Sequence, residues 1–195
     1  MAIRKRATEI PTIDVNIVSI QPQGDETEYI LDTATAISVS PEIEETEATK
    51  LVIKGILRAQ KPAVSTITGN TITLTDNVFT PELVEILQGG TITRDTDGHI
   101  TSYEPPAAGS NDKGKVFTLR AYSAQYDASG QIVAYECIAY PNCQGTPISI
   151  SSEDDTFRVS EYTINSAPKK GESPYVIEYV ETLPEEGNTE TTYSF

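Results

Sequence analysis

The sequence is short of the residues on which most enzymes depend. It contains no Trp, a single His (His99) and only two Cys, at positions 137 and 143. One His leaves a Ser-His-Asp or Cys-His arrangement with one possible base and no positioned partner. The many carboxylates leave a glycosidase-type pair possible by number, but the Trp residues that usually stack against sugars are missing. Glycine-rich loops that bind phosphate are also missing. We therefore expect no catalytic residues, and we predict that the protein is not an enzyme.

The number and spacing of the two cysteines argue against a disulfide scaffold and against a metal centre. Two thiols are too few to hold a small domain together. The spacing Cys137-x5-Cys143 is not that of a zinc site, and the histidines of such a site are absent. We predict reduced, structural thiols, no bound metal and no cofactor.

A calcium loop is the alternative that has to be weighed against this prediction. Residues 90–103, GTITRDTDGHITSY, are typical of a hairpin with Asp97-Gly98 as its turn. Position one of an EF-hand loop would be Thr93 instead of Asp, and Pro105-Pro106 forbids the exit helix. The pattern therefore favours the hairpin. The residues that match later EF-hand positions are Asp95, Asp97, Gly98, Ile100 and Glu104.

Positive charge is scarce. Lys and Arg total 14 against 29 Asp and Glu, which gives a net charge of −15. This balance argues against binding to nucleic acid phosphates, although an acidic surface suits a protein past which DNA must slide. No run approaches the length of a transmembrane helix, and the basic start MAIRKR is not followed by the apolar core of a signal peptide. We expect no membrane association.

What the sequence has in plenty is β-branched residues in alternation. Residues 12–20, 34–44, 51–57, 71–75, 116–125, 131–140 and 175–180 read as strands. The pattern predicts a single, mainly antiparallel β domain of nine to eleven strands. We expect an N-terminal arm over residues 1–11, one β domain over 12–184, and an acidic C-terminal tail over 185–195.

One stretch predicts a helix. In TPELVEILQGG, Thr80 is a suitable N-cap, Pro81 suits the first helical position, and Gly89-Gly90 ends the helix. Leu83, Val84, Ile86 and Leu87 form one apolar face, so a short helix over residues 80–88 is expected to cover the sheet.

Two long hairpins are predicted, over residues 34–57 and 116–140, and a turn is expected at 141–145. The first hairpin is expected to carry an acidic tip, because glutamates crowd residues 42–47. Long hairpins leave strand edges that invite pairing with another chain. The candidate inter-subunit contacts are Glu42, Glu44, Glu45 and Glu47 at this tip and the basic cluster Arg4, Lys5 and Arg6.

The order of these segments resembles bacteriophage major tail proteins, the subunits of the tail tube. The resemblance covers residues 52–184: TPELVEILQGG, a hairpin ending near YEPP, then FTLRAYSAQYDASGQIVAYECIAYPNCQG, DDTFRVSEYTINSAP and a closing strand with TLP. Its most distinctive pieces are residues 82–90, 140–143 and 156–157.

The resemblance implies a mainly β, antiparallel sandwich or barrel-like tail-tube fold with one short flanking helix. It also implies a structural subunit that assembles with itself into stacked hexameric rings around a channel for viral DNA. It further implies a virion location, assembly in the bacterial host cytoplasm, and partners such as tape measure and terminator proteins. DNA would pass without specific binding. The tail type, contractile or non-contractile, stays open. The competing hypothesis is a monomeric β-sandwich module that binds carbohydrate or acts as an adhesin.

Overall fold

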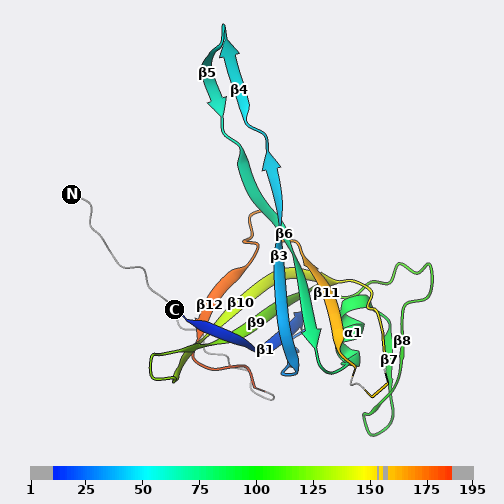
Figure 1. The fold of residues 1–195 in the computed structure, drawn as a ribbon. Coiled ribbons are helices and arrows are strands. Elements are labelled where there is room, and N and C mark those ends of the chain that lie inside the picture. The colour runs from blue at the N-terminus through cyan, green and yellow to red at the C-terminus, as the bar shows by residue number, and fades with distance from the viewer. Residues whose placement is uncertain (1–10, 153, 156–157, 186–195) are drawn as a thin grey trace.

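The chain folds mainly as antiparallel β-structure. The computed structural model describes residues 11–152, 154–155 and 158–185, so most of the predicted N-terminal arm and C-terminal tail lies outside it. The described residues form twelve strands and one helix (Figure 1). This confirms the predicted mainly β class with one helix, although the strands outnumber the nine to eleven expected. The strands are β1 (Thr12–Pro22), β2 (Tyr29–Leu31), β3 (Ala34–Thr46), β4 (Thr49–Ile53), β5 (Ile56–Lys61), β6 (Val64–Asp76), β7 (Thr91–Arg94), β8 (Ile100–Glu104), β9 (Phe117–Tyr126), β10 (Ile132–Gly145), β11 (Ser160–Ser166) and β12 (Val176–Val180).

Eight strands belong to one sheet that forks at β10. The order is β2-β1-β9-β10-β11-β6-β3, and β12 also pairs with β10. Residues 135–139 of β10 pair with β12, whereas Cys143 to Gly145 pair with β11. The sheet therefore folds over along β10 into two layers and does not close into a barrel.

The turn expected at residues 141–145 is not formed, because these residues belong to β10 at the point where the sheet forks. Asn142 has a positive φ of 50°, and the pairing of β10 with β9 shifts between Tyr140 and Cys143. An extra residue of this kind bends a strand without ending it, as β-bulges do. The segment PNCQG thus redirects β10 from one layer to the other. Its Pro and Asn are as typical of a bulge as of a turn.

The main core lies between the two layers and under the helix. It contains buried aliphatic and aromatic residues from β1, β6, β9, β11 and α1 (Pro81–Gln88). A smaller cluster around Tyr122, Cys137 and Val180 packs on the opposite face of β9 and β10. The largest buried side chains of the main core include Phe117, Leu119, Ile72, Leu74, Tyr162 and Ile164.

The helix α1 agrees closely with the sequence prediction. It begins after Thr80, has Pro81 in its first turn, and buries Leu83, Val84, Ile86 and Leu87. Gly89 ends the helix with a positive φ of 84°, and its N–H donates to the carbonyl of Glu85 at 2.9 Å. An eight-residue helix is marginal in water by itself, so its apolar contacts with the sheet stabilise it.

A two-stranded ribbon rises out of the body (Figure 1). It is built by β3 and β6, which pair from Ala34–Asp76 up to Thr46–Val64, and it continues as the separate hairpin β4–β5. The hairpin predicted over residues 34–57 is therefore wrong in extent, because the ribbon spans residues 34–76. Its turn is Lys54-Gly55, with φ values of 48° and 77°. The sequence concealed this turn, because a Lys is an unusual residue at positive φ.

Candidate assembly surfaces

We refer to residues 40–70, the part of this ribbon that projects from the body, as the arm, to residues 40–46 with 64–70 as its proximal ribbon, and to β4–β5, residues 49–61, as its distal hairpin. Between the two halves the pairing is interrupted at Glu47-Ala48 and Pro62-Ala63. Pro62 has no N–H to donate, and the Thr46 hydroxyl accepts the Val64 N–H at 3.1 Å across the gap. The arm is thus one continuous projection made of two short β-ladders.

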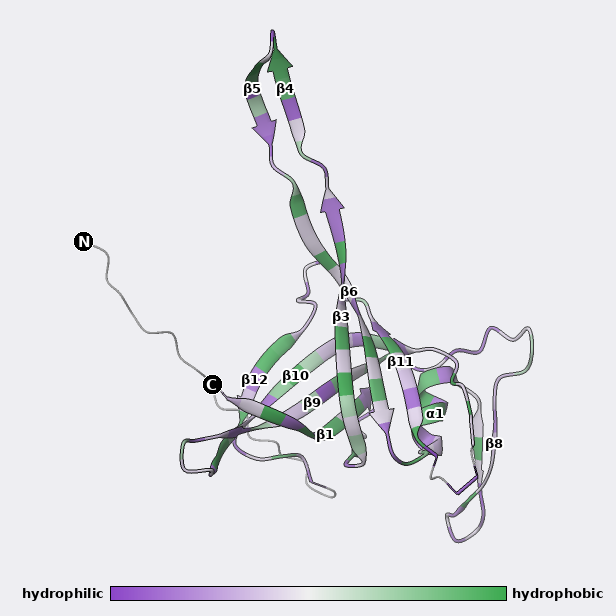
Figure 2. Cartoon of the chain, in the orientation of Figure 1, coloured by the Kyte–Doolittle hydropathy of each residue, from purple (hydrophilic) through white to green (hydrophobic). Residues whose placement is uncertain are grey.

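The arm carries aliphatic residues along its length, seen as green segments of β4 and β5 in Figure 2, and their side chains are exposed. Ile56 is 57% exposed and Leu57 is 52% exposed, which is far above the exposure of core residues. A two-stranded hairpin with no covering layer is marginally stable in water, and an exposed apolar patch of this kind typically marks an interaction surface. The exposed aliphatics of the arm are Ile43, Leu51, Val52, Ile53, Ile56, Leu57, Val64 and Ile67.

The two halves of the arm carry opposite charge. The distal hairpin contains four cations, and no Asp or Glu occurs in the sequence between Glu47 and Asp76. The ion pairs among the described residues involve Arg94, His99 and Arg120, so the distal cations pair with no described residue. A basic hairpin stands out on a chain of net charge −15. The four cations are Lys50, Lys54, Arg58 and Lys61.

The sequence prediction overlooked this basic hairpin, since it treated residues 51–57 only as a returning strand. The sequence does contain a signal for it. Residues 48–75 form a 28-residue stretch without a carboxylate, which is unusual in so acidic a protein.

The predicted acidic contacts are exposed, but they do not form a tip. Glu42, Glu44 and Glu45 lie on β3 in the proximal ribbon, and Glu47 lies just beyond it. Glu42 accepts a hydrogen bond from the Thr71 hydroxyl at 3.1 Å, and Glu45 accepts one from the Ser65 hydroxyl at 3.3 Å. The position of the acidic group is thus corrected from the tip to the lower half of the arm. The other predicted contacts, Arg4, Lys5 and Arg6, lie outside the described residues.

The open strand edges agree with the prediction for the first long hairpin, which contains β3, but not for the second. β9 lies between β1 and β10, so the hairpin of residues 116–140 is in the middle of the sheet and offers no edge for another chain. Among the described strands, β3 pairs only with β6, and β12 pairs only with β10. The prediction of edges from long hairpins failed here because β1 and β12, distant in sequence, flank this hairpin.

The β12 side of the sheet is a second apolar surface. Val176, Ile177 and Tyr179 are 45%, 44% and 39% exposed, and Ile132 and Val133 at the start of β10 are also exposed. Glu178 lies among them on β12. An edge strand with apolar side chains is suited to pair with a strand of another chain.

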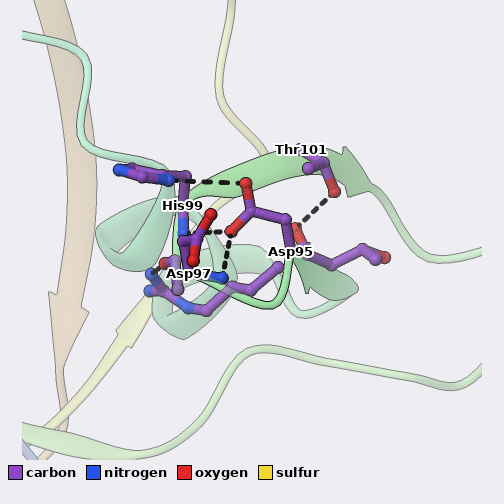
Figure 3. Close-up of polar contacts among 7 residues, drawn as sticks. Asp95, Asp97, His99 and Thr101 are labelled. Atoms are coloured by element: carbon purple, nitrogen blue, oxygen red, sulfur yellow. Dashed lines mark hydrogen bonds and ion pairs between the residues drawn. The ribbon is translucent and has the colours of Figure 1, made fainter.

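The hairpin β7–β8 explains the cluster of Asp and His without invoking a metal ion (Figure 3). Asp95 Oδ1 accepts the backbone N–H of Asp97 at 3.0 Å and of His99 at 2.8 Å. Its Oδ2 lies 3.4 Å from Nδ1 of His99. This is the Asx-type bonding that closes a turn. The side chains of Asp95, Asp97 and His99 offer ligand atoms within 4.8 Å of one another, but all three are exposed.

The calcium-loop geometry is not formed. Glu104, at the twelfth position of that motif, pairs with Thr91 at the opposite end of the hairpin from the Asp97-Gly98 turn. The hydroxyl of Thr101 donates to the carbonyl of Thr93 at 3.0 Å, so the residue at the first position belongs to the strand ladder. The expected hairpin with its turn at Asp97-Gly98 is confirmed.

The two thiols are buried and reduced, as predicted. Cys143 belongs to the main core and Cys137 to the small cluster on the opposite sheet face, so the two are held apart by the sheet. Burial raises the pKa of the Cys137 thiol to about 11 and that of the Cys143 thiol to about 12. The Cys143 thiol donates to the carbonyl of Tyr140 at 3.2 Å. Neutral buried thiols of this kind are poor nucleophiles.

Two hollows accompany these surfaces. One, of about 390 Å³, lies beside α1 and contains the 2.6 Å ion pair between Arg94 and Glu82. The other is an open groove of about 810 Å³ between the start of β1 and the start of β3. Neither brings His99 or a Cys thiol to its lining. A search of the described residues for a helix with the length and apolarity of a membrane span finds none.

Comparison with known proteins gives little further guidance. No protein-family model matches the chain, and no curated protein sequence matches it. Among solved structures, it is similar to a chain in the 6-fold symmetrised cryo-EM structure of the anti-feeding prophage baseplate. The identity is 5%, the alignment covers 93% of this chain and 98% of that chain, and the TM-score is 0.38. A likeness this distant carries no argument about function.

Proposed function

We propose that this chain is a structural subunit of a phage tail tube, assembling with itself into stacked hexameric rings. The central channel would conduct viral DNA during ejection, and tape measure and terminator proteins would be further partners. The subunit would act in the virion after assembly in the bacterial host cytoplasm. No catalytic step and no cofactor belong to this role.

The observation that carries the proposal is the arm. Its aliphatics are half exposed although a folded monomer normally buries such residues. Burying apolar surface contributes about 25 cal/mol per Å², so covering a whole arm is a substantial driving force for association. Because the arm projects from the body (Figure 1), it reaches surfaces that the body of the same copy does not. An assembling subunit uses such a projection; a monomeric module has no need of one.

The charge of the chain supports a channel for DNA. A net charge of −15 repels phosphates, so DNA passes such a surface without being held. Among the described strands, β3 and β12 each pair with one strand, so neighbouring subunits of a ring can continue the sheet at residues 34–39 of β3 or at β12. Sheet pairing within a ring and arm contacts between rings are separate tasks, and the chain has a separate surface for each.

The proposal is tested by negative-stain electron microscopy of the full chain over a range of concentrations, with sedimentation velocity in parallel. We expect rings with six-fold symmetry, and tubes at the highest concentrations. A particle near 21.2 kDa at every concentration would instead support a monomeric binding module and would contradict the proposal. Rings of another symmetry would keep the structural role and correct the ring number.

A further inference from the structure

We propose that the arm of one copy docks on the arm of a second copy, with the basic distal hairpin of one lying on the acidic proximal ribbon of the other. This inference rests on the proposed function in one respect only, namely that copies of the chain associate. It specifies which surface of the next copy receives the arm.

The charges of the two halves match in number and sign. The proximal ribbon and the adjoining Glu47 carry four exposed carboxylates, and the distal hairpin carries four cations. Elsewhere in the described chain Arg94 and Arg120 are paired with Glu82 and Glu28 of the same copy. The distal cations have no such partner among the described residues, so a carboxylate-rich surface of another copy complements them.

The apolar residues of the two halves match as well. Directly opposed residues of an antiparallel ladder share one face. On the distal hairpin the pairs Val52–Leu57 and Ile53–Ile56 therefore place aliphatics on both faces. On the proximal ribbon Ile43 and Ile67 form one apolar cross-strand pair. Packing these aliphatics together removes water from the contact, and ion pairs beside it are stronger in the lower local dielectric.

Docking of this kind is head-to-tail. Each arm gives its distal hairpin to one neighbour and receives the hairpin of another on its proximal ribbon. A heterologous contact that repeats in this way joins many copies, as a ring if the rotation between copies closes and as an open filament if it does not. The interruption at Glu47-Ala48 and Pro62-Ala63 separates the distal hairpin, which docks, from the proximal ribbon, on which the next copy docks. Two neighbouring arms shifted by about half an arm length therefore bring a distal hairpin onto a proximal ribbon.

Charge-swap variants of the full chain test the pairing. Lys54→Glu with Arg58→Glu takes the formal charge of the distal hairpin from +4 to 0, and Glu44→Lys with Glu45→Lys takes that of the proximal ribbon with Glu47 from −4 to 0. We expect each double variant alone to need at least about tenfold more protein to assemble, since the net attraction between the two halves is then lost. An equimolar mixture of the two should recover assembly, because each variant then complements the other. Assembly is measured by sedimentation velocity and negative-stain microscopy.

A matched control separates the contact from total charge. Lys113→Glu with Lys115→Glu changes the net charge by the same amount as the distal variant, on exposed residues of the loop before β9, which packs against the end of α1. This control should assemble like the wild type. All the substituted side chains are exposed, so thermal melting should be unchanged in every variant, which confirms that the body folds.

The outcomes separate this inference from the proposed function. A wild-type chain that stays monomeric overturns both. A wild-type chain that assembles, together with distal variants that assemble equally well or a mixture that does not recover, overturns the arm pairing alone. Binding of a short DNA duplex or of phosphatidylglycerol vesicles that is lost in the distal variant, with assembly intact, would assign the hairpin to phosphates and overturn the pairing too.

Discussion

Gly145 of β10 lies against Leu87 of α1 so closely that a β-carbon at position 145 would come within 2.5 Å of the Leu87 β-carbon. Gly114 approaches the carbonyl of Leu87 from the loop before β9 even more tightly. The next residue, Lys115, donates its N–H to the carbonyl of Ile86 at 2.8 Å. The last turn of the helix is therefore held by two glycines and a backbone hydrogen bond.

We predict that Gly145→Ala destabilises the folded protein. The added methyl group meets backbone and side-chain atoms of Leu87, which have little room to move, so a loss of about 1–3 kcal/mol is expected. The free energy of unfolding is measured by urea denaturation. Gly130→Ala serves as the comparison, because position 130 has a positive φ of 80° but no neighbouring atom within 4 Å. It should cost only the backbone strain, and a larger loss at 130 than at 145 would contradict the close packing.

Leu87→Asp should abolish the folded subunit and not merely its association. Leu87 is 1% exposed, and an isolated carboxylate in its place would be buried without a partner. The milder Leu87→Ala is expected to cost about 2–5 kcal/mol through the cavity it leaves. Near-UV circular dichroism and the urea midpoint measure both variants. A folded Leu87→Asp monomer with impaired assembly only would show that the helix is a contact surface and not part of the core.

The buried thiols predict a loss of stability at alkaline pH. Burial raises the pKa of Cys137 to about 11 and of Cys143 to about 12, from an ordinary value of 9.0. Above pH 9 the unfolded chain loses these protons before the folded chain does. Stability is therefore complete below pH 9 and falls as the pH rises toward 11 and 12.

The measurement is the urea midpoint between pH 8 and pH 10, below the range where buried tyrosines dominate. The double variant Cys137→Ala/Cys143→Ala should be less stable at pH 8 but should show a flatter decline between pH 9 and pH 10. An equally steep decline in this variant would show that other groups cause the alkaline loss.

Removing the distal hairpin of the arm should leave the body intact. Thr46 and Val64 are paired across the ribbon, so residues 47–63 can be replaced by an Asn-Gly turn at that point. We expect an unchanged melting temperature, because none of the deleted residues is buried, together with loss of assembly beyond a single ring. Thermal melting and negative-stain microscopy measure the two properties. Normal tubes from the shortened chain would show that the distal hairpin is dispensable.

The sequence predicts an element correctly where short-range signals mark both its type and its ends. Residues 80–90 combine an N-cap position, a proline, an apolar face and a glycine stop, and the helix forms there. Asp97-Gly98 predicted the turn of β7–β8, and alternation predicted β1, β9 and β12. In the arm, by contrast, the turn at Lys54-Gly55 has no such signature. Alternation alone placed β3 opposite residues 51–57, where the structure pairs it with β6.

The sequence by itself determined the composition of this protein's surfaces: four cations without a carboxylate between Glu47 and Asp76, and a cluster of glutamates just before them. Only the tertiary structure decided that these charges lie on one projecting arm, at separate levels, and that residues 116–140 are interior. The physical reason is that strand order depends on long-range pairing. Which strands flank a hairpin is set by how the apolar faces of distant segments pack, and local patterns do not encode that choice.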